Sequence, residues 1–188
     1  MGRLLKLNLS NEYLKNYFQK FSTLIIDENI NKKILELAKK IKKINKNKVI
    51  ILGNGGSAAM ASHVSVDLTK TSGIRSINFN ESDLLTCFSN DFGYEKWCAK
   101  ALEYYSDDKD IVILISSSGN SNNIVNAAKF CIKKNIFFTT FTGFNGKNKL
   151  SKLGNINFSV NSKNYNHIEM THHIWLLAIV DILINEKF

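Results

Sequence analysis

The apolar and polar positions along the chain follow two different periods. Residues 11–45 carry apolar side chains at three- and four-residue spacing with lysines between them, which is typical of amphipathic helix. A break near Asp27–Asn31 divides this segment into two helices. Asn47–Leu52, with the sequence NKVIIL, is a short apolar run rich in β-branched residues, which predicts a buried strand. The chain therefore starts with two helices and then enters a sheet.

After this strand, strand-like and helix-like segments alternate. The expected strands are Ile74–Phe79, Asp110–Ser116, Ile136–Thr142 and Ile156–Val160. The expected helices cover residues 57–70, 94–105, 121–134, 147–153 and 167–185. Strict alternation predicts an α/β fold in which a parallel sheet has helices on both faces. With no internal linker or repeat, we expect residues 1–188 to form one domain, whose N-terminal helices, residues 1–46, pack on it or lie at an oligomer interface.

Composition narrows the class of protein. The chain is 44% hydrophobic, and no apolar run approaches the roughly 20 residues of a membrane span. Its start, MGRLLKLNLSNEY, lacks the apolar core of a secretory signal, so we expect a cytoplasmic protein without a membrane partner. Cys87, Cys98 and Cys131 are an odd number with no C-x-x-C spacing, which argues against a disulfide framework or a thiolate zinc site. Reduced, mostly buried thiols are the expectation.

The formal charge of +9 raises the question of an anionic partner. Of the 25 basic residues 23 are lysine, and only Arg3 and Arg75 are arginine, the residue on which base readout mainly depends. A solvated lysine surface is therefore the favoured interpretation, an anionic partner is the alternative, and nucleic acid is not expected.

Two loops that follow expected strands carry the chemistry. The first, Gly53–Ser57, reads GNGGS; its small residues allow backbone amides to approach an anion, but a plain tight turn explains them equally well. The second, Ser116–Ser121, reads SSSGNS and places four hydroxyls and several amides before a helix. An N-cap needs one serine rather than four, so the second loop favours a phosphate site. Both loops lie beyond the carboxyl ends of strands, where ligands bind in open parallel sheets.

These motifs resemble those of the sugar isomerase (SIS) domain family. GNGGSAA followed by a histidine, SNDFGYE at Ser89–Glu95 and SSSGNSNN at Ser116–Asn123 look like the motifs of the bacterial phosphoheptose isomerases, and the likeness covers essentially the whole chain. It implies a three-layer, flavodoxin-like sandwich and a homotetramer. It also implies conversion of sedoheptulose 7-phosphate to D-glycero-D-manno-heptose 7-phosphate for surface polysaccharides such as lipopolysaccharide or capsule.

The resemblance also implies roles for individual residues. The phosphate group would be held by the loop serines Ser116, Ser117, Ser118 and Ser121. Asn54, Gly55, Gly56 and Ser57 would contact the substrate from the facing loop. Asp91 would line the open-chain sugar.

The catalytic positions depart from the family pattern, in which four side chains bind zinc and two of them act as acid and base. His63 and Asp67 occupy the His-x-x-x-Glu positions, Glu169 replaces a glutamine, and Leu177 replaces the last histidine. Asp67 and Glu169 are then the acid–base candidates. A rearranged zinc site of His63, Asp67, Glu169 and His173 is chemically sensible.

Several alternatives stay open at this point. His172 and His173 also fit a packed, hydrogen-bonded pair at an interface, and His167 stands where the family has an arginine. The leading hypothesis is a phosphosugar isomerase. The alternatives are a non-catalytic phosphosugar-binding or protein-assembly module, such as the relative that associates with the replication initiator, or an isomerase of another phosphosugar.

Overall fold

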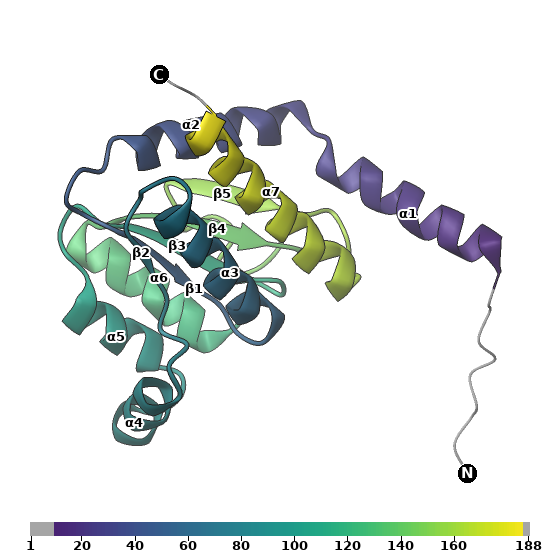
Figure 1. Ribbon diagram of the computed structural model, residues 1–188. Helices are drawn as coiled ribbons and strands as arrows, with labels where there is room; N and C mark the ends of the chain where they lie inside the picture. Colours follow the sequence, from purple (N-terminus) through teal and green to yellow (C-terminus); the bar gives the residue numbers. More distant parts are fainter. Residues whose placement is uncertain (1–9, 186–188) are drawn as a thin grey trace, which may run out of the picture.

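The computed structural model describes residues 10–185 and has one five-stranded parallel sheet covered by helices on both faces (Figure 1), as the sequence predicts. The strands run in the order β2-β1-β3-β4-β5. They are β1 Val49–Leu52, β2 Ser76–Ile77, β3 Ile111–Ser116, β4 Phe137–Thr142 and β5 Ile156–Ser159. The helices are α1 Asn11–Ile25, α2 Glu28–Lys42, α3 Gly56–Lys70, α4 Ser82–Phe92, α5 Trp97–Tyr105, α6 Asn122–Lys134 and α7 Tyr165–Asn185.

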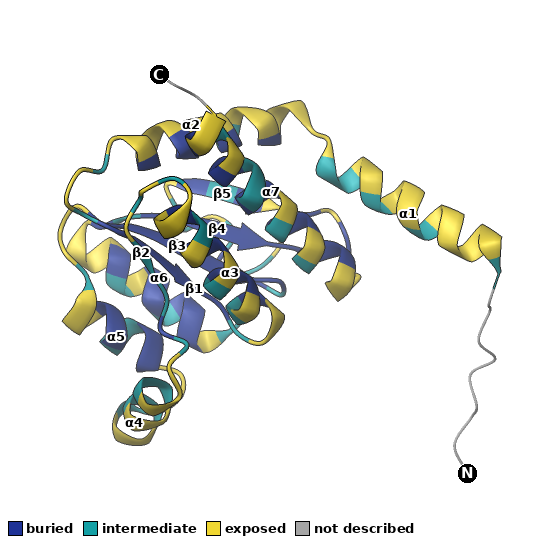
Figure 2. Ribbon diagram, viewed as in Figure 1, coloured by how far each residue is buried: buried dark blue, intermediate teal, exposed yellow. Residues whose placement is uncertain are grey.

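The central strands are buried on both sides, and their side chains alternate between two cores. Ile51 and Ile113 face one core, which α2, α3 and α7 cover, whereas Ile50 and Val112 face the other, which α5 and α6 cover. The continuous apolar runs in β1 and β3 are explained by this double burial, which Figure 2 shows as dark blue strands between the helices.

β1 and β3 are neighbours, but the helices that follow them, α3 and α6, lie on opposite faces of the sheet. In doubly wound sheets this change of side opens a crevice at the carboxyl ends of the two strands. The two loops that the sequence singled out, Gly53–Ser57 and Ser116–Ser121, follow β1 and β3 and therefore face each other across this crevice.

The two N-terminal helices behave differently. The Asp27 carboxylate caps α2 by accepting hydrogen bonds from the amides of Asn29 and Ile30, and α2 packs on α7 and β5. α1 contains no buried residue and extends away from the sheet beside α7 (Figures 1 and 2). Its end is attached by the indole of Trp175, which donates to the Ile25 carbonyl at 3.1 Å.

The structure differs from the expected elements in three places, of which one is the strand expected over Ile74–Phe79, because β2 covers only Ser76–Ile77. α4 was missed, although Leu84, Leu85, Phe88 and Phe92 have helical spacing. The helix expected over residues 147–153 is wrong: these residues form turns after a short 3₁₀ helix, Phe144–Gly146. The reason is Asn148, whose side-chain oxygen accepts from the amides of Leu150 and Ser151 and so replaces helical bonding.

α7 is 21 residues long and apolar enough, by length and composition, to cross a membrane. Half of its most apolar window is buried inside the protein, where it packs on α1, α2 and α3. Core packing accounts for its composition.

Candidate active site

The serine loop, Ser116–Ser121, forms a tight turn between β3 and α6. Gly119 has a φ of +64°, its amide donates to the Ser116 carbonyl at 2.9 Å, and the Asn148 side chain occupies the space that a Cβ would fill. The Ser116 hydroxyl bonds the Ser121 hydroxyl at 3.1 Å. Only glycine fits at position 119, so the turn has one fixed shape.

Two features of this loop leave hydrogen-bonding groups for a ligand. The Ser117 hydroxyl is buried and has no hydrogen-bond partner within residues 10–185. The first turn of α6 has no side-chain cap, although Ser121 stands at the N-cap position. A buried hydroxyl without a partner costs about 1–3 kcal/mol, and uncapped amides at a helix start attract anions. Both deficits would be corrected by an anion.

The glycine loop, Gly53–Ser57, begins α3 in a similar way. Gly55, at the N-cap, has a φ of +56°, and no side chain caps the helix. Gly53 has no room for a side chain, because a Cβ there would meet Ser57 at 2.7 Å. Together the glycine and serine loops form what we call the loop wall: two uncapped helix starts on one crevice.

Asn54 and Asn123 join the two loops, a link that the sequence analysis did not identify. Each amide donates to the oxygen of the other, at 3.0 and 2.8 Å, across 69 residues of sequence. Asn123 is 2% exposed and also donates to the buried thiol of Cys98, whose pKa burial raises above its usual range. The sequence signal was the position of Asn123 in the first turn of α6, facing a loop that also contains an asparagine. This pair fixes the separation of the two loops.

The segment that follows α4 returns to the loop wall. The hydroxyl of Tyr94 donates to the Asn54 side chain at 3.2 Å. Asp91, expected to line the sugar, lies in the last turn of α4, is exposed, and accepts from Asn90 at 3.0 Å. Only two residues separate Asp91 from Tyr94, so Asp91 lies near the rim of the crevice.

A second polar cluster lies where α3 and α7 cross. His63 Nδ1 is 2.9 Å from His173 Nε2, and His63 Nε2 is 3.2 Å from the Asp67 carboxylate. The side chain of His63 is 52% exposed. The structure therefore brings together three of the four residues that the sequence analysis assigned to a rearranged metal site.

The fourth residue, Glu169, lies one turn earlier on α7, with its carboxylate directly against Gly56 at the start of α3. The partial positive charge of a helix start favours a carboxylate at this point. Because Glu169 meets Gly56 and His173 meets His63, α3 and α7 run in the same direction here. Leu177, one further turn along α7, therefore lies toward Asp67 and is half-buried against the core.

Comparison with known proteins identifies the family of this chain. A family model described as the SIS domain matches residues 12–143, more than half of the chain. The chain belongs to the SIS domain family. This SIS domain is 30% identical to the phosphoheptose isomerase of Aneurinibacillus thermoaerophilus, over 95% of this chain and 98% of that protein. It is 34% identical to the phosphoheptose isomerase of Buchnera aphidicola, over 96% and 92%.

The solved structures agree on the fold. A phosphoheptose isomerase from Francisella tularensis superposes with a TM-score of 0.82 at 23% identity. The superposition covers 94% of the present chain and 96% of the Francisella protein. The resemblance inferred from the two loops is confirmed at the level of family and architecture.

The α3–α7 crossing of this SIS domain does not fit zinc as it stands. Within residues 10–185, no three His, Cys, Asp or Glu side chains are arranged as metal ligands. The facing nitrogens of His63 and His173 bond each other, and Glu169 is turned to the helix start. Burial and the neighbouring His63 lower the pKa of His173, although Asp67 opposes them, so His173 is neutral near pH 7.

The other two histidines of α7 face away from this cluster. His172 is fully buried, bonds the Thr142 carbonyl at 2.9 Å, and has a pKa lowered to about 4 by burial. His167 is buried against Tyr17 and Phe21 of α1, and neither ring nitrogen has a hydrogen-bond partner among the described residues. His172 and His173 are thus hydrogen-bonded but not to each other, and only His173 belongs to the crossing of the SIS domain.

Proposed function

We propose that this SIS domain is an aldose–ketose isomerase that converts sedoheptulose 7-phosphate to D-glycero-D-manno-heptose 7-phosphate. The observation that carries the proposal is the buried Ser117 hydroxyl, which has no hydrogen-bond partner within residues 10–185 and lies on the loop that leads to the uncapped start of α6. A phosphate group supplies acceptors for these donors without needing a cation. The relatives named phosphoheptose isomerase support the choice of a seven-carbon sugar.

In this proposal the phosphate binds the loop wall, on Ser116, Ser117, Ser118 and Ser121, and Asn54 to Ser57 contact the substrate from the opposite side. The open-chain sugar then extends from the loop wall toward Glu169 and the α3–α7 crossing. Tyr94 on the rim contacts Asn54 of the loop wall, and Asp91 would contact the hydroxyls of the sugar from the last turn of α4.

The isomerisation moves one proton between neighbouring carbons and one between their oxygens, through an enediol. We assign the carbon proton to Glu169, because its carboxylate lies against the loop wall at Gly56. Glu169 would take the proton from C1 of the ketose and return it to C2. Asp67, paired with His63, which in turn bonds His173, would serve the transfer between the oxygens.

Zinc, which the family pattern implies, stays a prediction for this chain. His63, Asp67, Glu169 and His173 are suitable donors chemically, but they are not arranged as a ligand set. The roles assigned above to Glu169 and Asp67 do not require zinc.

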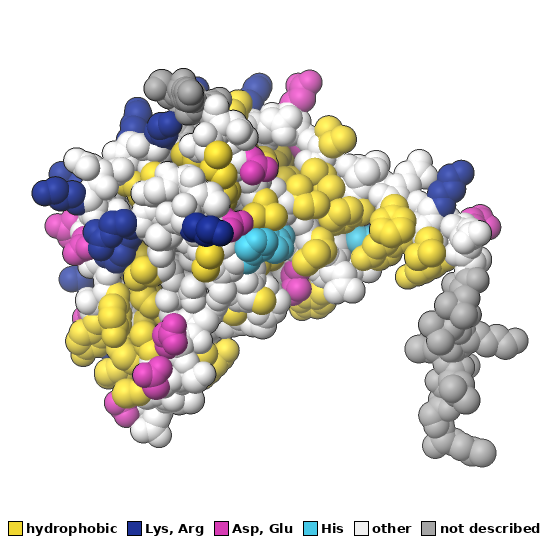
Figure 3. Space-filling view, in the orientation of Figure 1, with side chains coloured by type: hydrophobic (Ala, Val, Ile, Leu, Met, Phe, Trp, Pro, Cys, Tyr) yellow, Lys and Arg dark blue, Asp and Glu magenta, His cyan; other side chains and the backbone are white. Residues whose placement is uncertain are grey.

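Self-association is part of the proposal, with a homotetramer as the expected assembly. α1 has no buried residue and exposes Tyr13, Leu14 and Phe18, and Figure 3 shows hydrophobic side chains gathered along it. A second copy of the chain would cover this surface. Light scattering would test it: Phe18→Glu should dissociate the assembly, whereas Asn16→Glu, with the same added charge on α1, should not.

We further propose that the enzyme acts in the cytoplasm and supplies heptose for surface polysaccharides. A second candidate function is phosphosugar binding without catalysis. It is favoured by Leu177, an apolar side chain at the end of the α3–α7 crossing, and by the mutual bonding of His63 and His173.

One experiment separates the two candidates. The purified protein is given sedoheptulose 7-phosphate, with and without added zinc, and both product formation and thermal unfolding are followed. Turnover supports the isomerase. A rise in melting temperature without turnover supports the binding module, because ligand at about 100 times its Kd adds roughly 2.7 kcal/mol. Neither response would refute both.

A further inference from the structure

The opposite edge of the sheet contains a cavity that the isomerase site does not use. Its volume is about 590 Å³, and it is lined by residues at the end of α2, before β1, and before or at the first residues of β3 and β4. Four of these residues are lysines and two are aspartates: Lys40, Lys43, Lys46, Lys109, Asp108 and Asp110. In Figure 3 lysine and arginine side chains gather on the end of the body that faces away from α1.

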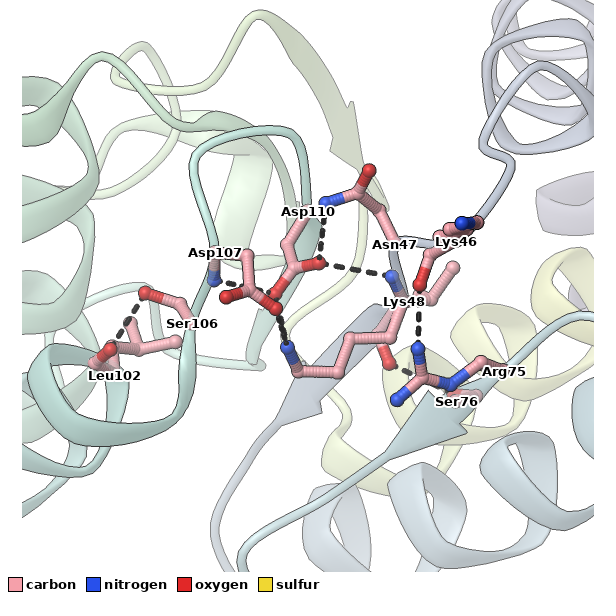
Figure 4. Close-up of polar contacts among 10 residues, drawn as sticks. Lys46, Asn47, Lys48, Arg75, Ser76, Leu102, Ser106, Asp107 and Asp110 are labelled. Carbon is pink, nitrogen blue, oxygen red and sulfur yellow. Dashed lines mark hydrogen bonds and ion pairs between the residues drawn. The ribbon is translucent and has the colours of Figure 1, made fainter.

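Asp110, the buried one of the two aspartates, has a charge that is already compensated. Asp110 is 1% exposed and accepts from the Lys48 ammonium at 2.7 Å, from the Lys48 amide at 2.9 Å and from the Asp107 amide at 2.8 Å (Figure 4). Burial lowers the pKa of Lys48, but its bonds to Asp107 and Asp110 raise it further, so Lys48 stays charged. Asp110 therefore has no capacity left to neutralise the lysines of the cavity.

The same bonds hold the cavity wall in place. Asp110 bonds both Lys48 and the Asn47 side chain, and the Arg75 guanidinium donates to the Lys46 carbonyl (Figure 4). The loop that carries Lys46 is thus attached to β2 on one side and to the start of β3 on the other. Because the wall is already ordered, the entropic cost of binding a ligand there is lower.

The ammonium groups of three lysines in this cavity are available. Within residues 10–185, Lys43, Lys46 and Lys109 make no side-chain hydrogen bond or ion pair. Lys40 lies over the ring of Phe137, 4.7 Å from its centroid. A smaller cavity of about 290 Å³ shares Lys40, Lys43 and Phe137 and adds Lys39. The result is one basic groove with an aromatic floor.

We propose that this groove binds a ligand with two or more phosphates and an aromatic ring, of the nucleoside di- or triphosphate class. Lysine ammoniums bind phosphate oxygens as point charges, and a base stacks on an aromatic face beside a cation. The combined volume is that of an ordinary small-molecule site. The site lies at the amino ends of the strands, so it would be occupied independently of the loop wall.

Isothermal titration of the full-length protein with ATP tests the proposal. ATP should bind saturably, and saturation with sedoheptulose 7-phosphate should leave its affinity unchanged. Substituting Lys43, Lys46 and Lys109 together with glutamine should weaken ATP binding by about tenfold or more. The matched control, glutamine at the exposed Lys15, Lys32 and Lys129, should keep it.

Three results would overturn the proposal. Displacement of ATP by the sugar phosphate, or loss of ATP binding in Ser118→Asp, would place ATP at the loop wall. Tripolyphosphate binding as tightly as ATP would remove the role of the aromatic ring. Absence of saturable binding, with lower melting temperatures in the lysine variant, would mean that these lysines only offset the carboxyl ends of α2 and α6.

Discussion

The loop wall is held by part-buried hydrogen bonds between its two loops, whereas the polar side chains of the α3–α7 crossing are more exposed and mainly bond one another. In the loop wall Asn54 and Asn123 form a reciprocal hydrogen-bonded pair, and position 119 has room only for glycine. At the crossing His63 is 52% exposed, and its partners are Asp67 and His173. The loop wall is preorganised for a single anion, while the crossing has charges and tautomers that can rearrange around a substrate.

This difference predicts that the two regions control different kinetic constants. Substitutions in the loop wall should change KM, because phosphate binding is the same in the ground state and the transition state. Substitutions at the crossing should change kcat. Three kinetic experiments, in order of decreasing expected effect, test this division, and a fourth experiment tests the stability of α7.

Glu169→Gln should have the largest effect, a loss of about 1,000-fold in kcat, the size expected when a general base is removed. Asp67→Asn should lose about tenfold to 100-fold, because it acts through His63 in the proposed mechanism. The measurement is the steady-state rate with sedoheptulose 7-phosphate. Loss of activity mainly through KM in Glu169→Gln would contradict the division.

Ser118→Asp should raise KM by about 100-fold, or about 2.7 kcal/mol, because its carboxylate repels the phosphate group. The Ser118 hydroxyl accepts from the Asn120 amide at 3.3 Å, a bond that an aspartate can keep. Ser118→Asn is the neutral control of equal size and should change KM far less. Equal effects of the two variants would show that charge is not involved.

Asn54→Leu and Asn123→Leu test whether the amide pair fixes the pocket width. Each single variant should raise KM by about tenfold, and the double variant should be little worse than either, giving a coupling energy of about 1–2 kcal/mol. Unfolding in urea supplies the control for stability. Additive effects on KM would separate the two residues and leave Asn123 with a purely structural role.

The fourth experiment measures stability and separates the two faces of α7. The pKa of His172 is lowered to about 4 in the folded protein, below the value of about 6.5 in an unfolded chain. The contribution of neutral His172 to the free energy of unfolding should therefore be fully present above pH 6.5. As the pH falls from 6.5 to 4, the free energy of unfolding should decrease by up to about 1.4 kcal/mol per pH unit.

His172→Gln keeps a donor for the Thr142 carbonyl and should flatten this slope. The remaining slope reports His167 and His173, whose pKa values are also lowered by burial. Denaturant melts at several pH values measure it. A slope unchanged in His172→Gln would assign the acid sensitivity to His167 and His173 instead of His172.

Much of the fold follows from local pattern. The apolar runs of β1 and β3 and the alternation of strand and helix were sufficient to predict a parallel sheet, because each strand is buried on both faces. β2 was predicted too long, since only Ser76–Ile77 pairs with β1. α4 was overlooked because none of its residues is buried, although its apolar spacing is helical.

The candidate site was less accessible from sequence. The serine and glycine loops can be recognised by their composition. The Asn54–Asn123 pair, in contrast, forms because α3 and α6 follow neighbouring strands, and the strand order is known only from the structure. Likewise, the spacing of Glu169 and His173 could not show that α3 and α7 run in the same direction, so that Glu169 meets Gly56 and His173 meets His63.

The Asn54–Asn123 pair also determines how the protein ages. Asn54 precedes Gly55, and because glycine has no side chain to hinder it, the Gly55 backbone nitrogen can attack the carbon of the Asn54 side-chain amide. This attack releases ammonia, and hydrolysis of the resulting ring leaves aspartate or isoaspartate. Two hydrogen bonds to Asn123 hold that amide in the folded chain. Stored protein should therefore deamidate at residue 54 faster in Asn123→Leu than in the parent, as mass spectrometry of peptides would reveal; equal rates would remove the link. The hydrogen bonds that fix the distance between the two loops should thus also slow the deamidation of Asn54.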